Sequence, residues 1–214
     1  MSLKLYLLRH GETTHSQSGG FCGSLDPGLT ESGFAMAEAF ADAYAHVPWD
    51  AIYVSPMTRT RQTAAPLCDR IGMVPIVRDG LKEMHFGDWE DLTKPEVNER
   101  YHDDYVRWLT EPAWNPPTGE GGETGVQVAS RAMLVIAEIE EKHPSGHVLV
   151  VCHKSTIRLM ICSLMGMDLG RYRDRIEMLT ASVSLVIFDV HGPLLKILGD
   201  RHHLPPELRE RAGT

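Results

Sequence analysis

The sequence predicts a three-layer α/β fold, in which helices cover both faces of a mostly parallel central sheet. Short apolar segments alternate along the chain with longer segments of helical periodicity, an order that is typical of parallel sheets. The segments 3–8 and 147–152 are almost wholly apolar, as expected for strands that are buried on both faces. No repeat, low-complexity tract or linker divides the chain, so we expect residues 1–214 to form a single domain.

Local signals define the elements expected in the first part of the chain. Thr30 precedes a helical pattern and is a favoured N-cap residue. Pro56 is tolerated in the first turn of a helix, and clustered Ser and Gly mark a loop. The expected elements are a strand at 3–8, a loop at 14–28, a helix from Thr30 to about Ala45, a strand at 51–54, a helix from Ser55-Pro56 to about Arg70 and a strand at 74–77.

The second part of the chain begins with a long excursion. Residues 81–122 contain three of the four tryptophans, and we expect a helical insertion at about 91–122, with a loop, that covers the sheet edge. Trp108 and Trp114 within it are expected to pack in the core. The elements expected after it are a helix at 123–142, a strand at 147–152, a helix at 155–165, a hairpin of 183–189 and 194–198, and a loosely held polar tail from about 200.

Composition excludes several classes of function. A net charge of -8 argues against a nucleic-acid partner, because such proteins usually present a basic face. No apolar run reaches the ~20 residues of a membrane helix, so no membrane association is expected. The four cysteines lack metal-ligand spacing and indicate a reduced, cytoplasmic protein. His202-His203 is interpreted as part of the solvated tail and not as a metal site.

Reactive side chains follow three of the expected strands. Arg9 and His10 end the first strand, Arg59 lies one helical turn after the second, and His153 ends the strand at 147–152. If these strands are parallel neighbours, two histidines and two arginines converge at one sheet edge, where α/β proteins bind ligands. The helix expected after His153 would point its N-terminal amides there, which favours an anion. The pattern predicts an anion that is held and then attacked.

Taken together, these segments resemble the histidine phosphatase superfamily, which has the phosphoglycerate-mutase-like fold. The resemblance runs from Leu3 to about Gly199. The matching segments are Leu8-Arg9-His10-Gly11-Glu12-Thr13, Phe21-Cys22-Gly23-Ser24-Leu25-Asp26 with Leu29-Thr30-Glu31-Ser32-Gly33, Ser55 to Thr63, Leu81 to Glu90, Gly119 to Glu123 and Val150-Val151-Cys152-His153.

The resemblance implies a role for each reactive residue. His10 would attack phosphorus and carry the phosphoryl group. Arg9 and Arg59 would hold phosphate oxygens in fork geometry, and His153 would add a further donor. Glu83 would protonate the leaving alkoxide and later activate water. No metal and no cofactor is expected, because the Arg and His side chains supply the positive charge.

Four further residues are candidates for substrate binding: Ser16, Cys22, Gly23 and Lys154. Two of them depart from the family pattern. Ser16 stands where the family usually has Asn, and Lys154-Ser155 stand where it commonly has Gly-Gly. A serine hydroxyl can still donate to phosphate, with shorter reach. The Lys154 side chain points either to solvent or into the pocket.

Three functions stay open at this point. The favoured one is a metal-independent phosphatase for a small phosphomonoester. The alternatives are a cofactor-dependent phosphoglycerate mutase and a catalytically idle protein that binds phosphorylated ligands. The excursion between Glu90 and Gly119 lacks the paired arginines of glycolytic mutases, and Phe86 and Met84 replace residues of the mutase loop. Fewer cations for a second anionic group favour transfer to water.

The substrate itself stays open among sugar phosphates, phosphoserine, sugar bisphosphates and a nucleotide-loop phosphate. A homodimer stays open as the assembly.

Overall fold

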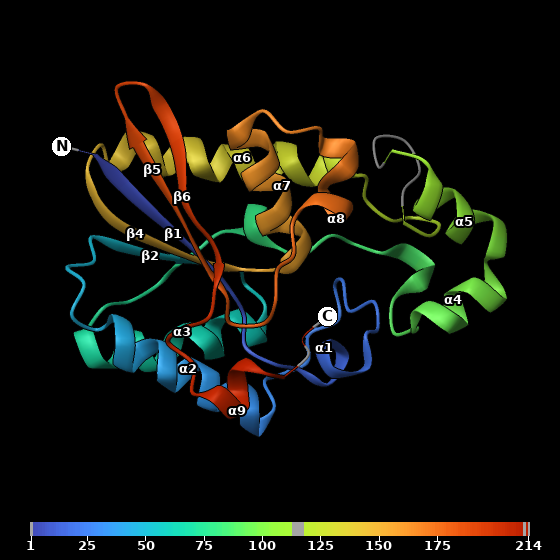
Figure 1. The fold of residues 1–214 in the computed structure, drawn as a ribbon, viewed down its shortest axis with the longest axis horizontal. Coiled ribbons are helices and arrows are strands. Elements are labelled where there is room, and N and C mark those ends of the chain that lie inside the picture. Colours follow the sequence, from blue (N-terminus) through green and yellow to red (C-terminus); the bar gives the residue numbers. More distant parts are fainter. Residues whose placement is uncertain (1, 113–117, 212, 214) are drawn as a thin grey trace.

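One six-stranded mixed sheet forms the centre of the computed structural model, which describes residues 2–112, 118–211 and 213. The strand order is β3-β2-β4-β1-β5-β6, and the strands cross the centre of Figure 1. Among the described residues the strands are β1 Leu3–Arg9, β2 Ala51–Val54, β3 Ile76–Val77, β4 Gly146–Cys152, β5 Val183–Asp189 and β6 Gly192–Asp200.

The strands that carry the predicted reactive residues are parallel neighbours, as expected. Strand β4 pairs in parallel with β1 on one side and with β2 on the other. Arg9 is the register partner of Cys152, and Val54 is that of Val151. The carboxyl ends of these three strands therefore lie side by side. Strand β5 runs antiparallel to β1 and forms the predicted hairpin with β6.

Helices cover both faces of the sheet, which confirms the α/β fold. The helices are α1 Thr14–Ser18, α2 Glu31–Tyr44, α3 Thr58–Ile71, α4 Lys94–Arg100, α5 His102–Thr110, α6 Gly125–Lys142, α7 Lys154–Met165, α8 Tyr172–Arg175 and α9 Pro206–Arg209. Helices α6 and α7 lie over one face, and α2 and α3 lie over the other (Figure 1). Within the described part of the chain, no helix is both long and apolar enough to span a membrane.

Both faces of the apolar strands are buried. Successive side chains of a strand point to opposite sides of the sheet, and helices cover each side. In β4, Val148 and Val150 belong to the core beneath α6 and α7. Leu149 and Val151, between and after them, belong to the core against α2 and α3. Alternate residues thus enter different cores, which explains why the sequence shows no apolar-polar alternation here.

The predicted elements differ from the structure most clearly at α1, α3 and β3. The expected loop at 14–28 contains the short helix α1, because Thr13 and Ser16 form a capping box. Helix α3 begins at Thr58 instead of at Pro56, with Met57 as its N-cap residue. Strand β3 is only two residues long because its pairing with β2 is limited to Ile76 and Val77.

The insertion lies at the edge of the sheet that is formed by the carboxyl ends of the strands. Helices α4 and α5 extend beyond the carboxyl ends of the strands, at the right of Figure 1. Trp108 of α5 packs edge-on against Trp89 and Phe21, with ring centroids 5.7 Å apart in both pairs. Its expected core packing is thus found, whereas Trp114 lies outside the described residues. The aromatic contacts place the insertion over the ligand-binding end of the fold.

The tail from residue 200 is docked, so the expectation of a loosely held tail is wrong. Leu204 is buried against Met36 of α2. The buried guanidinium of Arg201 donates to the backbone oxygens of Leu208 and Arg209 at 2.9 and 2.8 Å. Arg211 donates to the carboxylate of Glu12 at 2.7 Å. The polar residues that suggested mobility instead satisfy backbone groups of the tail and a buried carboxylate.

Candidate active site

A cavity of about 260 Å³ opens at the carboxyl ends of β1, β2 and β4. It is lined by eight of the nine residues that the sequence singled out, namely Arg9, His10, Ser16, Cys22, Gly23, Arg59, Glu83 and Lys154. The ninth, His153, lies behind His10, with ring centroids 5.3 Å apart. The convergence predicted from the strand ends is therefore present.

His10 presents one defined ring nitrogen to this cavity. Its Nδ1 lies 2.7 Å from the carbonyl oxygen of Gly11, and because a carbonyl can only accept, Nδ1 carries the proton and Nε2 carries the lone pair. Burial, followed by the nearby Arg59 and Arg9 cations, lowers the pKa of His10 well below its usual value. The imidazole is therefore neutral at neutral pH, as a nitrogen nucleophile must be.

Arg9 reaches the cavity from the last residue of β1. Its Nη1 donates to the backbone oxygen of Met178 at 2.7 Å and to that of Gly213 at 3.4 Å. Burial is the main cause that lowers the pKa of Arg9 to about 9. The guanidinium keeps its charge at neutral pH, and these carbonyls fix its position.

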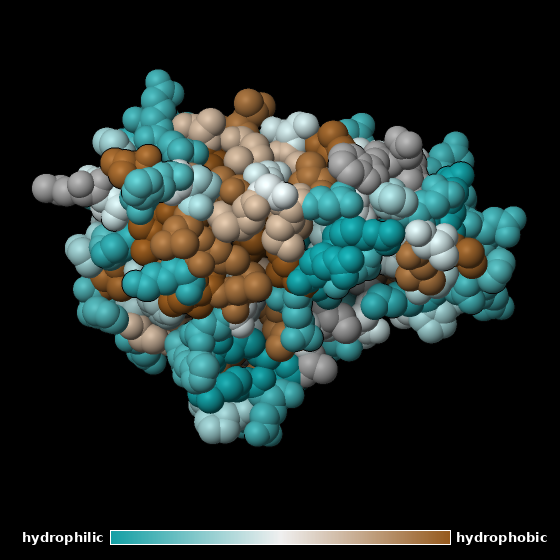
Figure 2. Space-filling view, turned by 45° about the horizontal axis from the view of Figure 1, so that its top comes forward, coloured by the Kyte–Doolittle hydropathy of each residue, from teal (hydrophilic) through white to brown (hydrophobic). Residues whose placement is uncertain are grey.

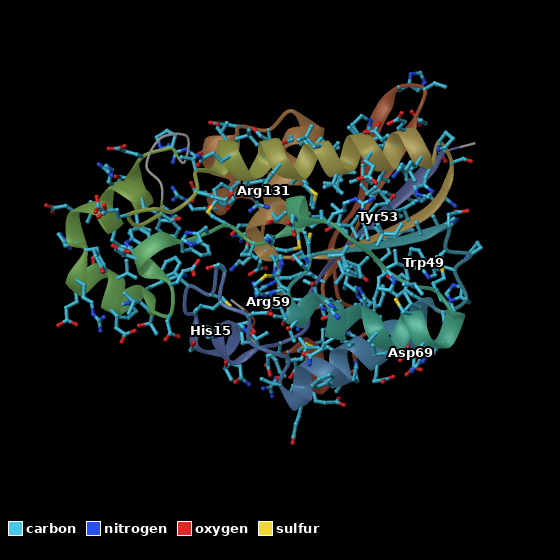
Figure 3. All side chains as sticks on the ribbon, turned by 180° about the vertical axis from the view of Figure 1, so that it is seen from behind. His15, Trp49, Tyr53, Arg59, Asp69 and Arg131 are labelled. Atoms are coloured by element: carbon cyan, nitrogen blue, oxygen red, sulfur yellow. The ribbon has the colours of Figure 1, made fainter. Side chains whose placement is uncertain are left out.

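Arg59 connects the substrate loop to the second histidine. Its Nη1 and Nη2 donate to the backbone oxygens of Leu25 and Gly23 at 2.6 and 3.0 Å, and its Nε donates to Nδ1 of His153 at 3.2 Å. A guanidinium has five N–H groups, so two remain for phosphate oxygens. Figure 3 shows Arg59 beside the α1 segment that carries His15.

His153 has both ring nitrogens engaged by protein groups. Because Arg59 Nε must donate, Nδ1 accepts, and Nε2 carries the proton toward Ser55 Oγ at 2.9 Å. Burial and the Arg59 charge lower the pKa of His153 well below its usual value, which keeps the ring neutral. In this structure His153 contacts Arg59, and a direct bond from it to phosphate stays a prediction.

Glu83 lies where the acid loop meets the beginning of α7. Its carboxylate accepts from the backbone N–H groups of Met84 at 2.8 Å and Ser155 at 3.2 Å. Arg131 of α6 holds the loop by donating to the backbone oxygens of Lys82 and Glu83 at 2.7 and 3.0 Å; it extends from α6 in Figure 3. No local sequence signal marked this contact, because the loop oxygens that Arg131 binds lie 48 or more positions away in the chain.

The small residues at the cavity wall shape it. Ser16 Oγ donates to the backbone oxygen of Thr13 at 2.9 Å and accepts from the Thr13 N–H at 2.8 Å. Gly23 has a φ of +48°, and a Cβ there would lie 1.9 Å from Glu90 Oε1, so a larger residue would strain the backbone and displace the Glu90 side chain. Burial raises the pKa of Cys22 to about 11 and keeps it a thiol. Substrate contacts by Ser16, Cys22 and Gly23 stay predictions.

The cavity is lined by more cations than the sequence analysis identified. Lys154, which was a candidate for substrate binding, lines it. Lys94, Arg158 and Arg173, which were not candidates, line it as well. The insertion is therefore not the only source of cations in the cavity, because Lys154 and Arg158 belong to α7 and Arg173 belongs to α8. Arg158 follows Lys154 by four positions on α7, so helical spacing could have predicted that they share a face. Among the described residues, no group of His, Cys, Asp and Glu side chains is arranged to hold a metal ion.

The fold and the cavity together define an α/β enzyme with a cation-rich site at its strand ends. Residues 5–201 match the histidine phosphatase superfamily (branch 1), and the chain belongs to this superfamily. It is a phosphoric monoester hydrolase, which confirms the sequence interpretation at the level of fold, family and enzyme class.

Known proteins similar to this chain include named phosphatases. Phosphoserine phosphatase 1 of Hydrogenobacter thermophilus is 34% identical over 170 residues, which cover 79% of this chain and 80% of that protein. The structure of YhfR from Bacillus stearothermophilus has a TM-score of 0.86 at 28% identity, covering 94% of this chain and 98% of the other. Phosphoserine phosphatase from Entamoeba histolytica, solved with 3-phosphoglyceric acid, has a TM-score of 0.84 at 27% identity, covering 95% and 100%.

Proposed function

We propose that the protein hydrolyses a small phosphomonoester without a metal ion, through a phosphohistidine formed on His10. The observation that carries the proposal is the state of the His10 ring. It is buried and neutral, its Nδ1 proton is donated to the Gly11 carbonyl so that Nε2 keeps its lone pair, and His10 lines the cavity together with Arg9, Arg59 and Glu83. A lone pair held beside two cations is suited to attack on a bound phosphate.

In the first half of the reaction, the Nε2 lone pair of His10 forms a bond to phosphorus while the ester P–O bond breaks. The carboxyl group of Glu83 gives its proton to the leaving alkoxide, so the product alcohol leaves neutral. Arg9 and Arg59 stabilise the negative charge on the phosphoryl oxygens. His153 supports this step by accepting a hydrogen bond from Arg59 Nε, which holds the guanidinium in place.

In the second half, the Glu83 carboxylate takes a proton from a water molecule. The water oxygen bonds to phosphorus, the P–N bond to His10 breaks, and inorganic phosphate leaves. Glu83 is protonated again and His10 recovers its lone pair, so the cycle closes without another reactant. The positive charge of Arg9 and Arg59 serves both halves, which is why no metal is required in this mechanism.

The decisive experiment measures hydrolysis of p-nitrophenyl phosphate in excess chelator, together with trapping of an acid-labile phosphoprotein. We expect turnover by the native protein, a trapped phosphoryl group, and loss of both in His10→Ala. Undiminished turnover in His10→Ala would exclude the phosphohistidine. Loss of turnover in chelator, restored by a divalent cation, would exclude the metal-independent mechanism.

The phosphoglycerate mutase alternative has a separate test. Conversion of 3-phosphoglycerate to 2-phosphoglycerate is measured with bisphosphoglycerate present, alongside release of inorganic phosphate. We expect phosphate release to dominate, and isomerisation faster than release would favour the mutase. The idle-binder alternative predicts that neither reaction occurs while phosphorylated ligands still bind.

We further propose that the protein works in the cytoplasm and forms a homodimer. Its four cysteines are free, with three of them buried, which suits a reducing compartment.

The proposed homodimer is supported by an apolar surface. Val190, Leu194 and Leu198 of the β5–β6 hairpin are exposed, and brown apolar surface is visible on the face that carries this hairpin (Figure 2). Sedimentation of the native protein against a Leu194→Glu variant tests the dimer: a monomeric native protein excludes it.

A further inference from the structure

The cavity contains more positive charge than one phosphate group needs. Besides Arg9 and Arg59, it is lined by Lys94, Lys154 and Arg158, whereas Glu83 is the one carboxylate that lines it among the described residues. This accumulation is local, because the whole chain has a net charge of -8. A concentration of cations in a concave site of an acidic protein indicates an anionic ligand.

Two of these cations are arranged as a pair on one helix. Lys154 begins α7 and Arg158 follows one turn later, so their side chains share a face. Neither takes part in any ion pair found within the described residues. The Nε of Arg158 is also buried without a hydrogen-bond partner. Because neither cation is held in an ion pair by the described part of the chain, both are available to an anion in the cavity that they line.

Arg173, another cation of the cavity, is already held by contacts with the protein. The Arg173 guanidinium lies 4.3 Å from the centre of the Trp108 ring and donates to the backbone oxygen of Glu111 at 3.1 Å.

Lys154, by contrast, is crowded by like charges. Burial first, and then Arg9, Arg158 and Lys94, lower the pKa of Lys154 to about 7. An anion between Lys154 and Arg158 would relieve both the repulsion and the desolvation.

We infer that Lys154 and Arg158 form a subsite for a second anionic group of the substrate, a carboxylate or a second phosphate. The inference rests on the proposed phosphatase function and narrows its substrate class to small phosphomonoesters with two anionic groups. The phosphate lies between Arg9, Arg59 and His10, and the second group reaches the first turn of α7. A cavity volume of about 260 Å³ is sufficient for the two anionic groups of a small molecule.

Matched substrate pairs test the subsite. 3-Phosphoglycerate and glycerol 3-phosphate share one skeleton, and a carboxylate in the first replaces a hydroxymethyl group in the second. Fructose 1,6-bisphosphate and fructose 6-phosphate differ by a second phosphate. We expect the doubly anionic member of at least one pair to have a kcat/KM at least about tenfold higher, since charge-assisted bonds are the strong ones. The pair that shows the preference identifies the anionic group.

Variants show whether the preference arises at α7. In the double variant Lys154→Gln/Arg158→Gln, kcat/KM for the doubly anionic substrate should fall at least about tenfold more than kcat/KM for the singly anionic substrate of the same pair. The matched control is Arg61→Gln, which removes an exposed cation of α3 outside the cavity and should keep the native preference. An equal loss for both members of a pair, or the same loss in Arg61→Gln, overturns the subsite.

Binding separates the subsite from the chemistry. Calorimetric titration of the four ligands into His10→Ala, with and without the Lys154→Gln/Arg158→Gln changes, gives Kd values without turnover. A preference of at least about tenfold that depends on Lys154 and Arg158 supports the subsite, even if the native protein hydrolyses nothing and the proposed function fails. Affinities within about threefold in every pair overturn the subsite, even if hydrolysis through His10 is found.

Discussion

Arg59 Nε donates a hydrogen bond of 3.2 Å to Nδ1 of His153, which joins the end of β4 to the first turn of α3. The two residues are 94 positions apart in the chain. Because His153 Nε2 faces Ser55 Oγ, the ring is held on both sides. His153 is therefore placed to orient the guanidinium that we propose for phosphate binding.

This contact predicts strong coupling between the two residues. His153→Ala should lower kcat/KM about 10- to 1000-fold, because a misplaced guanidinium stabilises the transition state less. In an Arg59→Ala background, the same change should have little further effect. The double-mutant cycle is measured with p-nitrophenyl phosphate. Additive losses would show that His153 contacts the phosphate independently of Arg59.

Proton donation by Glu83 predicts a dependence on the leaving group. Glu83→Gln should lower the rate constant of phosphohistidine formation about 100- to 10,000-fold for an alkyl ester such as glycerol 3-phosphate. The loss should be much smaller for p-nitrophenyl phosphate, because p-nitrophenolate leaves without being protonated. The two losses are compared in single-turnover measurements of phosphohistidine formation. Equal losses for both esters would contradict the role of Glu83 as the acid.

The lowered pKa of Lys154, about 7, predicts a pH-dependent affinity for doubly anionic ligands. The ammonium is charged below this value and neutral above it, so affinity should weaken about 3- to 10-fold between pH 6 and 8. Titrations into His10→Ala measure the effect. Lys154→Arg in the same background serves as the control, since arginine keeps its charge over this range. An identical pH profile with arginine would assign the change to the ligand's own ionisation.

His203 predicts a loss of stability in acid. The ring packs edge-on against Phe40, and burial lowers the pKa of His203 from 6.5 to about 4. The unfolded chain binds this proton more readily, so the stabilisation is complete above pH 6.5 and is lost as the pH falls toward 4. His203→Phe should reduce the pH slope of the unfolding free energy by up to about 1.4 kcal/mol per pH unit in this window. Urea unfolding at several pH values measures it, and an unchanged slope would contradict the prediction.

Docking of the tail predicts a large effect at Leu204. Leu204→Ala should lower the free energy of unfolding by about 2–5 kcal/mol, because the side chain is buried against α2. The exposed Leu134 of α6 is the matched control, and Leu134→Ala should change the free energy of unfolding by less than about 0.5 kcal/mol. Equal small effects of both changes in thermal or urea unfolding would support a loosely held tail.

The fold class and the set of reactive residues could be predicted from the sequence, because both depend on local patterns. Apolar runs mark strands buried on both faces, and a reactive residue directly after such a strand must lie at the sheet edge. This reasoning placed His10, Arg59 and His153 at one site. Element boundaries were less accurate at β3 and α3, where pairing and capping by distant or flanking groups decide the limits.

The tertiary structure alone decided which side chains contact one another and which charges stay unpaired. The polar tail is docked because Arg201 and Arg211 find backbone and carboxylate partners that composition cannot reveal. The inferred second-anion subsite depends on Lys154 and Arg158 forming no ion pair within the described residues, which is a property of all the surrounding elements. The sequence by itself therefore determined the chemistry offered to a phosphate group, and packing between distant segments decided how that chemistry is positioned and what else the cavity is suited to bind.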